Sequence, residues 1–183
     1  VPTLFGHEMA GTVAAVGDGV SVFKEGDTVV VANSAPCGFC DYCHRDRENL
    51  CEDLQYLNGA FAEYVRVPAR FVDRNTYAIP SDLTFRKAAL TEPLACVLHG
   101  VDACELPRYA RGASVEIIIF GAGPIGLLFV GALAAHGHHV ILADPNKKRL
   151  ETGTALGAQK TVIIERGGGQ VDAVKALTDS GQG

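Results

Sequence analysis

The sequence has no excess of basic residues, no recognisable secretory signal, no low-complexity tract and no internal repeat. Its 16 lysines and arginines against 21 aspartates and glutamates give a net charge of −5. This charge offers no electrostatic reason to expect nucleic acid or an anionic membrane surface as a partner. What remains is the composition of an ordinary soluble globular protein, with 48% hydrophobic and 20% charged residues.

Methionine is almost missing as well. The single methionine is Met9, and the chain starts at Val1. A complete reading frame normally begins with methionine, so we expect a fragment of a longer protein. Its 183 residues can build one large domain or two small ones, with a sizeable core in either case.

One long stretch without charge, residues 117–135, has the length of a membrane span. It contains four glycines and one proline, and its pattern is that of a strand, a turn and a helix. We therefore expect no membrane segment.

Residues 115–144 have the pattern of a dinucleotide-binding unit. The β-branched run 115–120 predicts a buried parallel strand. The turn Gly121-Ala122-Gly123-Pro124-Ile125-Gly126 matches G-x-G-x-x-G, and we expect a helix from about Pro124 to His136. A second strand over 139–143 ends on Asp144. The unit approaches the ~30 residues of such a βαβ motif, with an acid near the expected ~20-residue offset.

Each residue type in this turn has a physical purpose. Gly121 permits a tight exit from the strand, Gly123 lets a pyrophosphate approach bare backbone, and Gly126 lets the helix pack against the sheet. The helix starts at Pro124, which has no N–H, and the free N–H groups of its first turn, from Ile125 on, are offered to phosphates. The alternative is an ordinary strand-to-helix turn without a ligand.

Asp144 is expected to accept hydrogen bonds from adenosine ribose hydroxyls. Its charge would repel a 2′-phosphate, which favours NAD over NADP. Arg149 follows closely enough to reach the adenosine, although a solvated helix face is the simpler interpretation of Lys147, Lys148 and Arg149. We expect a helix over 147–156, a third strand over 161–164 and a helix over 171–177.

Four of the six cysteines form one cluster, spaced C-x2-C-x2-C-x7-C: Cys37, Cys40, Cys43 and Cys51. Four thiolates within fifteen residues can close a tetrahedral zinc site, and because no position stays open its role would be structural. An iron–sulfur cluster is the rival. His44 could in principle replace one ligand, but a solvated loop histidine is the simpler interpretation. Such a cluster beside a nucleotide-binding unit favours a reducing cytoplasm.

The remaining segments predict β-structure and one broken helical passage. We expect strands over 9–16, 28–32, 60–67 and 71–79, and helix over 85–104 with a break at Glu92-Pro93. Glu92 could be a helix N-cap or a metal ligand, and the residues alone leave both readings open. His7, in Gly6-His7-Glu8, is by itself more simply a hydrogen-bonded structural histidine than a ligand.

In this order the pieces resemble the zinc-containing medium-chain alcohol dehydrogenase family. The resemblance rests on residues 6–13 (GHEMAGTV), the four cysteines, the glycine-rich turn and Asp144, and it covers essentially the whole chain. It implies an α/β protein. Residues 1–95 would be a partial, β-rich GroES-like catalytic domain with a structural-zinc lobe at 36–52, and 96–183 the first half of a Rossmann NAD-binding domain.

The resemblance also implies a catalytic zinc held by His7, Glu8 and Glu92, with Glu8 either a ligand or the neighbouring carboxylate. Residues 91–95 (TEPLA) are similar to the sorbitol (polyol) dehydrogenase branch, where that glutamate binds zinc directly or through water. Asp144 followed by Arg149 is similar to that branch's NAD ribose site. The family's first zinc ligand and its proton relay have no counterpart here, and we expect them before Val1.

The activity that the resemblance implies is hydride transfer from a secondary alcohol, such as a polyol, to NAD. The partner would be a small-molecule alcohol, and the full-length protein a homodimer or homotetramer. The second half of the nucleotide domain would follow Gly183, so we expect this chain alone to be weakly active or inactive. Alternatives are an L-threonine 3-dehydrogenase-like activity, a zinc-free NADPH quinone or enone reductase, and a non-catalytic NAD-binding sensor.

Overall fold

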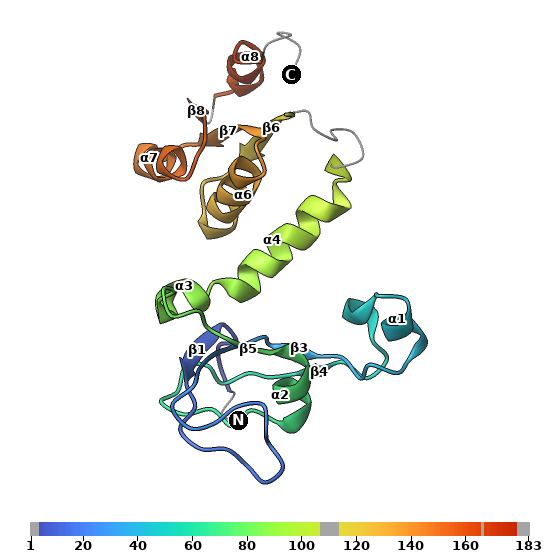
Figure 1. Ribbon diagram of the computed structural model, residues 1–183. Coiled ribbons are helices and arrows are strands. Elements are labelled where there is room, and N and C mark those ends of the chain that lie inside the picture. The colour runs from blue at the N-terminus through green and yellow to red at the C-terminus, as the bar shows by residue number, and fades with distance from the viewer. Residues whose placement is uncertain (1–3, 107–113, 166, 179–183) are drawn as a thin grey trace. The chain divides into compact units, whose positions relative to one another are not determined.

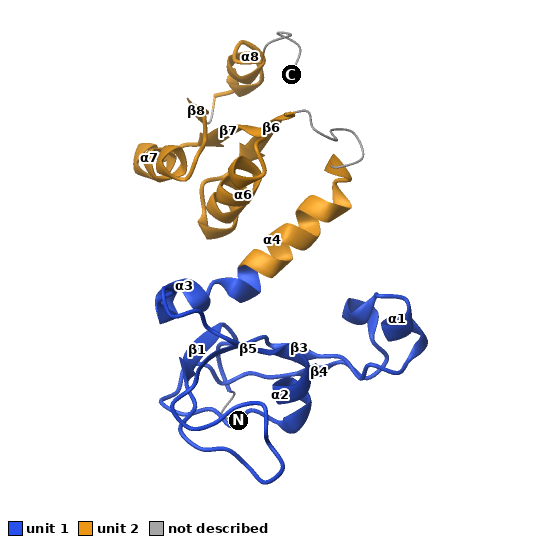
Figure 2. Ribbon diagram, viewed as in Figure 1, with its two compact units in different colours: residues 1–93 blue, residues 94–183 orange. Residues whose placement is uncertain are grey.

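The structure, a computed structural model, describes residues 4–106, 114–165 and 167–178 (Figure 1). The chain forms two compact units, Val1–Pro93 and Leu94–Gly183 (Figure 2). Each unit has a sheet and a hydrophobic core of its own.

The first unit is built on an antiparallel sheet with the strand order β1-β2-β5. Its strands are β1 (Met9–Thr12), β2 (Thr28–Val31) and β5 (Thr76–Ala78). Val31 pairs with Met9 on one side and with Thr76 on the other. Helix α2 (Ala69–Asn75) packs beside this sheet and buries Phe71, which is 1% exposed, in a core with Val31 and Leu57.

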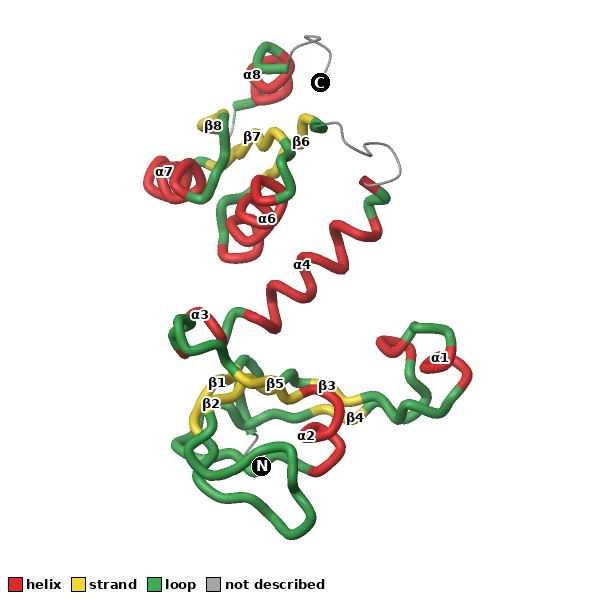
Figure 3. Tube along the Cα trace, in the orientation of Figure 1, coloured by secondary structure: helices red, strands yellow, loops and turns green. Residues whose placement is uncertain are grey.

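A lobe containing the four cysteines extends from a second, two-stranded sheet. This sheet pairs β3 (Ser34–Ala35) with β4 (Gln55–Tyr56) in antiparallel fashion. Between the two strands lie the short helices α1 (Asp41–His44) and η1 (Glu48–Leu50), which Figure 3 shows set in loops. We call residues 37–53 the cysteine lobe.

The second unit is a parallel sheet with the order β6-β7-β8 and helices on both of its faces. Its elements are α4 (Thr91–Ala103, beginning in the first unit), β6 (Glu116–Phe120), α6 (Pro124–Ala135), β7 (His139–Asp144), α7 (Lys147–Ala155), β8 (Lys160–Ile163) and α8 (Gln170–Lys175). Val140 and Leu142 of β7 face a core that includes Val130 of α6. Ile141 faces the opposite core with Val174 of α8.

This arrangement confirms the expected fold class, an α/β chain whose antiparallel GroES-like part is followed by a partial Rossmann unit. The strands of the second unit read as apolar runs because they are covered on both faces. Among the described residues, no helix is both long and apolar enough to cross a membrane.

One predicted strand of the first unit is wrong, and a second is confirmed only in part. Residues 60–67 form neither strand nor helix. The backbone at the start of this segment forms a few hydrogen bonds to the N-terminal loop. The N–H groups of Ala60 and Phe61 donate to the carbonyls of Gly6 and Phe5. Residues 71–75 lie in helix α2 and only 76–78 form a strand. Pro68 stands at the N-cap of α2, so the apolar run is bent into a helix that buries Phe71.

Smaller boundaries also differ from the prediction. Strand β1 ends at Thr12 and does not continue to Val16. The helical passage breaks between α3 (Phe85–Ala88) and α4, and Glu92-Pro93 lies inside the first turn of α4. Pro93 is tolerated there because the first N–H groups of a helix have no intrahelical partner. Glu92 is therefore a first-turn residue and not an N-cap.

Candidate metal and nucleotide sites

The four sulfurs of the cysteine lobe converge on one point. Cys37, Cys40, Cys43 and Cys51 each offer a ligand atom, and these atoms all lie within 4.8 Å of one another. The Cys40 and Cys43 sulfurs are 3.5 Å apart, and the Cys37 and Cys43 sulfurs are 3.9 Å apart. These separations are far longer than the ~2.05 Å of a disulfide. They bracket the ~3.8 Å edge of a tetrahedron with metal–sulfur distances of ~2.3 Å.

Backbone N–H groups surround the sulfurs. Cys37 Sγ accepts from the N–H groups of Phe39 (3.5 Å) and Cys40 (3.4 Å). Cys51 Sγ accepts from Cys37 (3.2 Å) and Asp53 (3.4 Å). Donors aimed at sulfur stabilise the thiolate over the thiol, so the lobe is arranged to hold negative sulfur, which is the form that binds metal.

Two of the thiols have pKa values shifted in opposite directions. The backbone N–H of Glu52 lowers the pKa of Cys40 to about 6. Burial raises the pKa of Cys43, an effect that the N–H of Gly38 offsets only in part. A divalent cation deprotonates a coordinating thiol outright, so it would bring Cys43 to the thiolate form as well. The donor set and its geometry fit a closed structural zinc site.

A second cluster joins residues far apart in the sequence: His7, Glu8 and Glu92. Their ligand atoms also lie within 4.8 Å of one another. His7 Nε2 is 3.6 Å from Glu92 Oε1, with the two side chains 44% and 18% exposed. That distance is too long for a hydrogen bond, and it is close to the ~3.4 Å expected between two ligand atoms each ~2.1 Å from a tetrahedral zinc.

Gly6 fixes the backbone that carries His7. It has φ of +82°, a conformation that favours glycine. Its carbonyl accepts from the N–H groups of Gly59 (2.9 Å) and Ala60 (3.1 Å). A Cβ at Gly6 would come within 2.6 Å of the Phe61 ring. His7 therefore follows a residue, Gly6, whose position is fixed by backbone hydrogen bonds and by the adjacent Phe61 ring.

The glycine-rich turn has the backbone geometry of a phosphate-binding loop. Gly121 has φ of +102°, and its N–H donates to the Ala143 carbonyl at 2.8 Å. Gly123 is the N-cap of α6, Pro124 follows it, and no described side chain caps this helix. The N–H groups of the first turn thus stay available to an anion. Ile125 is 49% exposed at this helix start.

Gly126 is required for close packing inside the turn. A Cβ there would lie 1.9 Å from the Gly121 carbonyl oxygen. Any side chain would push the helix start away from the strand end. The turn can be this tight only with glycine at 126.

Asp144 is a charged residue that is nearly fully buried, with 4% of its surface exposed. Its Oδ2 accepts the Ala122 N–H and its Oδ1 accepts the Asn146 N–H, both at 2.7 Å. The carboxylate ties the glycine-rich turn to the end of β7, and each oxygen keeps a further lone pair. Arg149 lies exposed in the first turn of α7, where its own N–H donates to Asn146 Oδ1.

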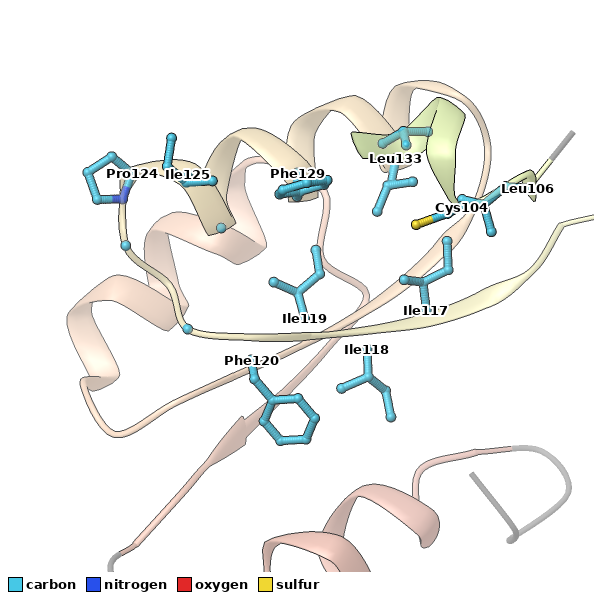
Figure 4. A pocket seen from close by; sticks show the side chains of 14 residues that line it. Cys104, Leu106, Ile117, Ile118, Ile119, Phe120, Pro124, Ile125, Phe129 and Leu133 are labelled. Atoms are coloured by element: carbon cyan, nitrogen blue, oxygen red, sulfur yellow. The ribbon is translucent and has the colours of Figure 1, made fainter. Parts of the chain in front are cut away.

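A cavity of about 630 Å³ lies beside the glycine-rich turn, bounded by α4, β6 and α6. Figure 4 shows Ile117 and Ile119 of β6 pointing toward Phe129 and Leu133 of α6. Ile118 and Phe120 point to the other side of the strand (Figure 4). Composition and periodicity did not predict this cavity, because it depends on how α4 packs.

Sequence analysis also missed two arginines that contact the cysteine lobe, Arg70 and Arg74 of α2. Arg70 donates to Asp53 and Arg74 to the Cys37 carbonyl. Their spacing of four residues places them on one face of a helix. Predicting a strand over this segment concealed that signal.

Comparison with known proteins gives the family. Residues 1–80 match the alcohol dehydrogenase GroES-like domain. The chain is 36% identical over 184 residues to the sorbitol dehydrogenase of Bacillus subtilis, covering 97% of this chain and 49% of that protein. The chain belongs to the zinc-containing medium-chain alcohol dehydrogenase family.

Other relatives in this family carry different names. The chain is 35% identical over 172 residues to the L-threonine 3-dehydrogenase of Idiomarina loihiensis, covering 91% of this chain and 47% of that one. The crystal structure of Escherichia coli galactitol-1-phosphate dehydrogenase superposes with a TM-score of 0.79 at 29% identity, covering 96% of this chain and 50% of that one. The chain spans about half the length of the medium-chain relatives it matches.

Proposed function

We propose that the whole protein is a zinc-dependent dehydrogenase that transfers a hydride from a secondary alcohol, specifically a polyol, to NAD. The observation that carries this proposal is the convergence of His7, Glu8 and Glu92 within 4.8 Å in a chain of this family. Relatives named sorbitol dehydrogenase and galactitol-1-phosphate dehydrogenase support a sugar alcohol as the substrate class.

The three side chains of this cluster fit a catalytic zinc. The imidazole of His7 and the carboxylate of Glu92 supply nitrogen and oxygen ligands. With the ligand expected before Val1, they leave a further position for substrate if Glu8 is the neighbouring carboxylate, as catalytic zinc sites require. Zinc bound there supplies a Lewis acid that lowers the pKa of an alcohol hydroxyl. His7 is 44% exposed and Glu8 is exposed, so an alcohol can approach the cluster from solvent.

The second unit would bind the nucleotide. The N–H groups at the start of α6, behind Gly123, would hold the pyrophosphate. Asp144 would accept the adenosine ribose hydroxyls, and its charge would exclude a 2′-phosphate, which favours NAD. Arg149 would reach the adenosine from α7. NAD supplies the hydride acceptor.

The cysteine lobe would hold a second, structural zinc. Its four ligands leave no position for substrate, and three of them are buried. The rival occupant, an iron–sulfur cluster, absorbs visible light whereas zinc does not, so an absorption spectrum of the purified chain distinguishes the two.

Zinc content per chain, with His7→Ala as the partner variant, tests both metal assignments. Two zinc ions that fall to one in His7→Ala would support a catalytic metal at His7, Glu8 and Glu92 and a structural one in the lobe. One ion that survives the substitution would support the lobe alone and contradict metal binding by the three residues in this chain. Absence of zinc would contradict both.

A second candidate activity is that of an L-threonine 3-dehydrogenase, which the relative of that name at 35% identity favours. Reduction of NAD by the whole protein with sorbitol or xylitol, and not with threonine, is the outcome that the polyol proposal predicts. Turnover of threonine alone would replace it.

We propose that the whole protein works in the cytoplasm as a homodimer or homotetramer. Sedimentation of the whole protein would test the oligomeric state.

A further inference from the structure

Helix α2 contacts both ends of the cysteine lobe through two arginines. Arg70 holds the C-terminal end: its Nη1 donates to the Asp53 carbonyl and its Nη2 to Asp53 Oδ2, both at 2.9 Å. The N–H of the same Asp53 donates to the Cys51 sulfur at 3.4 Å. Arg70 thus fixes a residue whose backbone stabilises one of the four sulfurs.

Arg74 holds the N-terminal end of the lobe. Its Nη2 donates to the Cys37 carbonyl at 3.4 Å. The guanidinium also covers Gly38, where a Cβ would lie only 1.9 Å from Arg74 Nη2. Gly38 has φ of +82°, so glycine serves here both for the turn and for the close approach of the arginine.

Arg74 contacts the peptide between Cys37 and Gly38, which lies beside the sulfurs of the cluster. The N–H of this peptide, that of Gly38, interacts with the Cys43 sulfur. The preceding peptide carries the Cys37 N–H, which donates to the Cys51 sulfur at 3.2 Å. A hydrogen bond to the carbonyl of a peptide polarises its N–H. A cation at the Cys37 carbonyl therefore strengthens the Gly38 donor and holds it in place.

The cysteine site would be negatively charged even with zinc bound. Four thiolates and one zinc ion carry a net charge of −2. The guanidinium groups of Arg70 and Arg74, on one face of α2, bring positive charge to the two ends of the cysteine lobe. Arg45, which like Arg70 has a described ion pair at the lobe, is bound differently. It pairs with Asp41 on α1 at 3.1 Å, and both side chains are more than half exposed.

We infer that Arg70 and Arg74 are positioning residues that hold the cysteine lobe in its ligating conformation and slow the release of its metal. This inference rests on the proposal that the four cysteines bind zinc. Outer groups that orient metal ligands typically change metal affinity by about 10- to 100-fold. Because neither arginine touches a sulfur in the described contacts, each acts through the backbone donors that it fixes.

The test is the rate at which a chromogenic chelator removes zinc from the full 183-residue chain, with all variants in a His7→Ala background so that only lobe zinc is followed. Arg70→Gln and Arg74→Gln are expected to release zinc about tenfold faster. The matched control, Arg45→Gln, is expected to release it at the parent rate. Circular dichroism establishes that each variant has kept its fold.

Lysine variants separate positioning from bulk. Arg74→Lys keeps a cation for the single bond to Cys37 and is expected to restore most of the slow release. Arg70→Lys cannot bond Asp53 O and Asp53 Oδ2 with a planar fork, so it should stay fast. These two variants carry the test even where a glutamine variant does not fold.

Zinc that leaves Arg70→Gln and Arg74→Gln no faster than Arg45→Gln overturns the inference and leaves the zinc site standing. Equal acceleration in all three variants also overturns it, because the effect is then one of net charge. A parent chain without lobe zinc overturns the zinc proposal and the inference together.

Discussion

Two glycines of helix α6 differ in the space that is free for a side chain. A Cβ at Gly126 would lie 1.9 Å from the Gly121 carbonyl oxygen, whereas a Cβ at Gly131 would meet nothing within 4 Å. We expect Gly126→Ala to destabilise the second unit by about 1–3 kcal/mol through overpacking and to weaken NAD binding. Gly131→Ala should be neutral or stabilise by up to about 1 kcal/mol. Urea unfolding measures both, and equal stability of the two variants would contradict the prediction.

Asp144 is a second position where one atom type matters. Both carboxylate oxygens accept backbone N–H groups, in a buried bond from Ala122 and a partly buried one from Asn146. In Asp144→Asn the amide NH₂ must face one of these donors, so we expect a loss of about 1–3 kcal/mol even without nucleotide. Asp172→Asn, on the exposed face of α8, is the control. Thermal unfolding that is unchanged in Asp144→Asn would mean that the ribose role is its main one.

The residue types with the strictest requirements were the most predictable from sequence. Glycine at 121 and 126 was expected at the turn because only backbone without Cβ permits it, and the structure shows the positive φ and the close approach. The cysteine spacing likewise predicted a cluster that the structure brings together. The convergence of His7 with Glu92 depends on packing between distant segments, so only the family resemblance indicated it.

The helices and strands also differ in how well the sequence predicted them. The strands and helices of the second unit were predicted to within about two residues, because buried β-branched runs alternate there with helices and glycine turns. Helix α2 was missed because its apolar run resembles a strand until Pro68 and the burial of Phe71 are known. The arginines that contact the cysteine lobe were missed with it.

The cysteine lobe is an element whose order should depend on its metal. Its buried residues are the cysteines themselves, separate from the core of Val31, Leu57 and Phe71. We expect chelation to expose the amides of residues 37–53 to hydrogen exchange while those of β2 stay protected. Cys40→Ser should have the same effect without chelator, and Cys104→Ser, in the turn that follows α4 and outside the cluster, should not. Exchange throughout the first unit would instead show that the lobe supports its core.

At the scale of the whole molecule, the two units have separate cores and separate proposed ligands. A ligand that binds only the native state stabilises what it binds, by about 2.7 kcal/mol at 100 times its Kd. We therefore expect NAD to slow hydrogen exchange in β6, β7 and α6 and to leave β1 and β2 unchanged. NADP at the same concentration should have a much smaller effect if Asp144 has the proposed ribose role, because its charge would then repel the 2′-phosphate. Equal protection of both units by NAD would mean that they unfold as one cooperative body, and equal protection by both nucleotides would remove Asp144 as the selective residue.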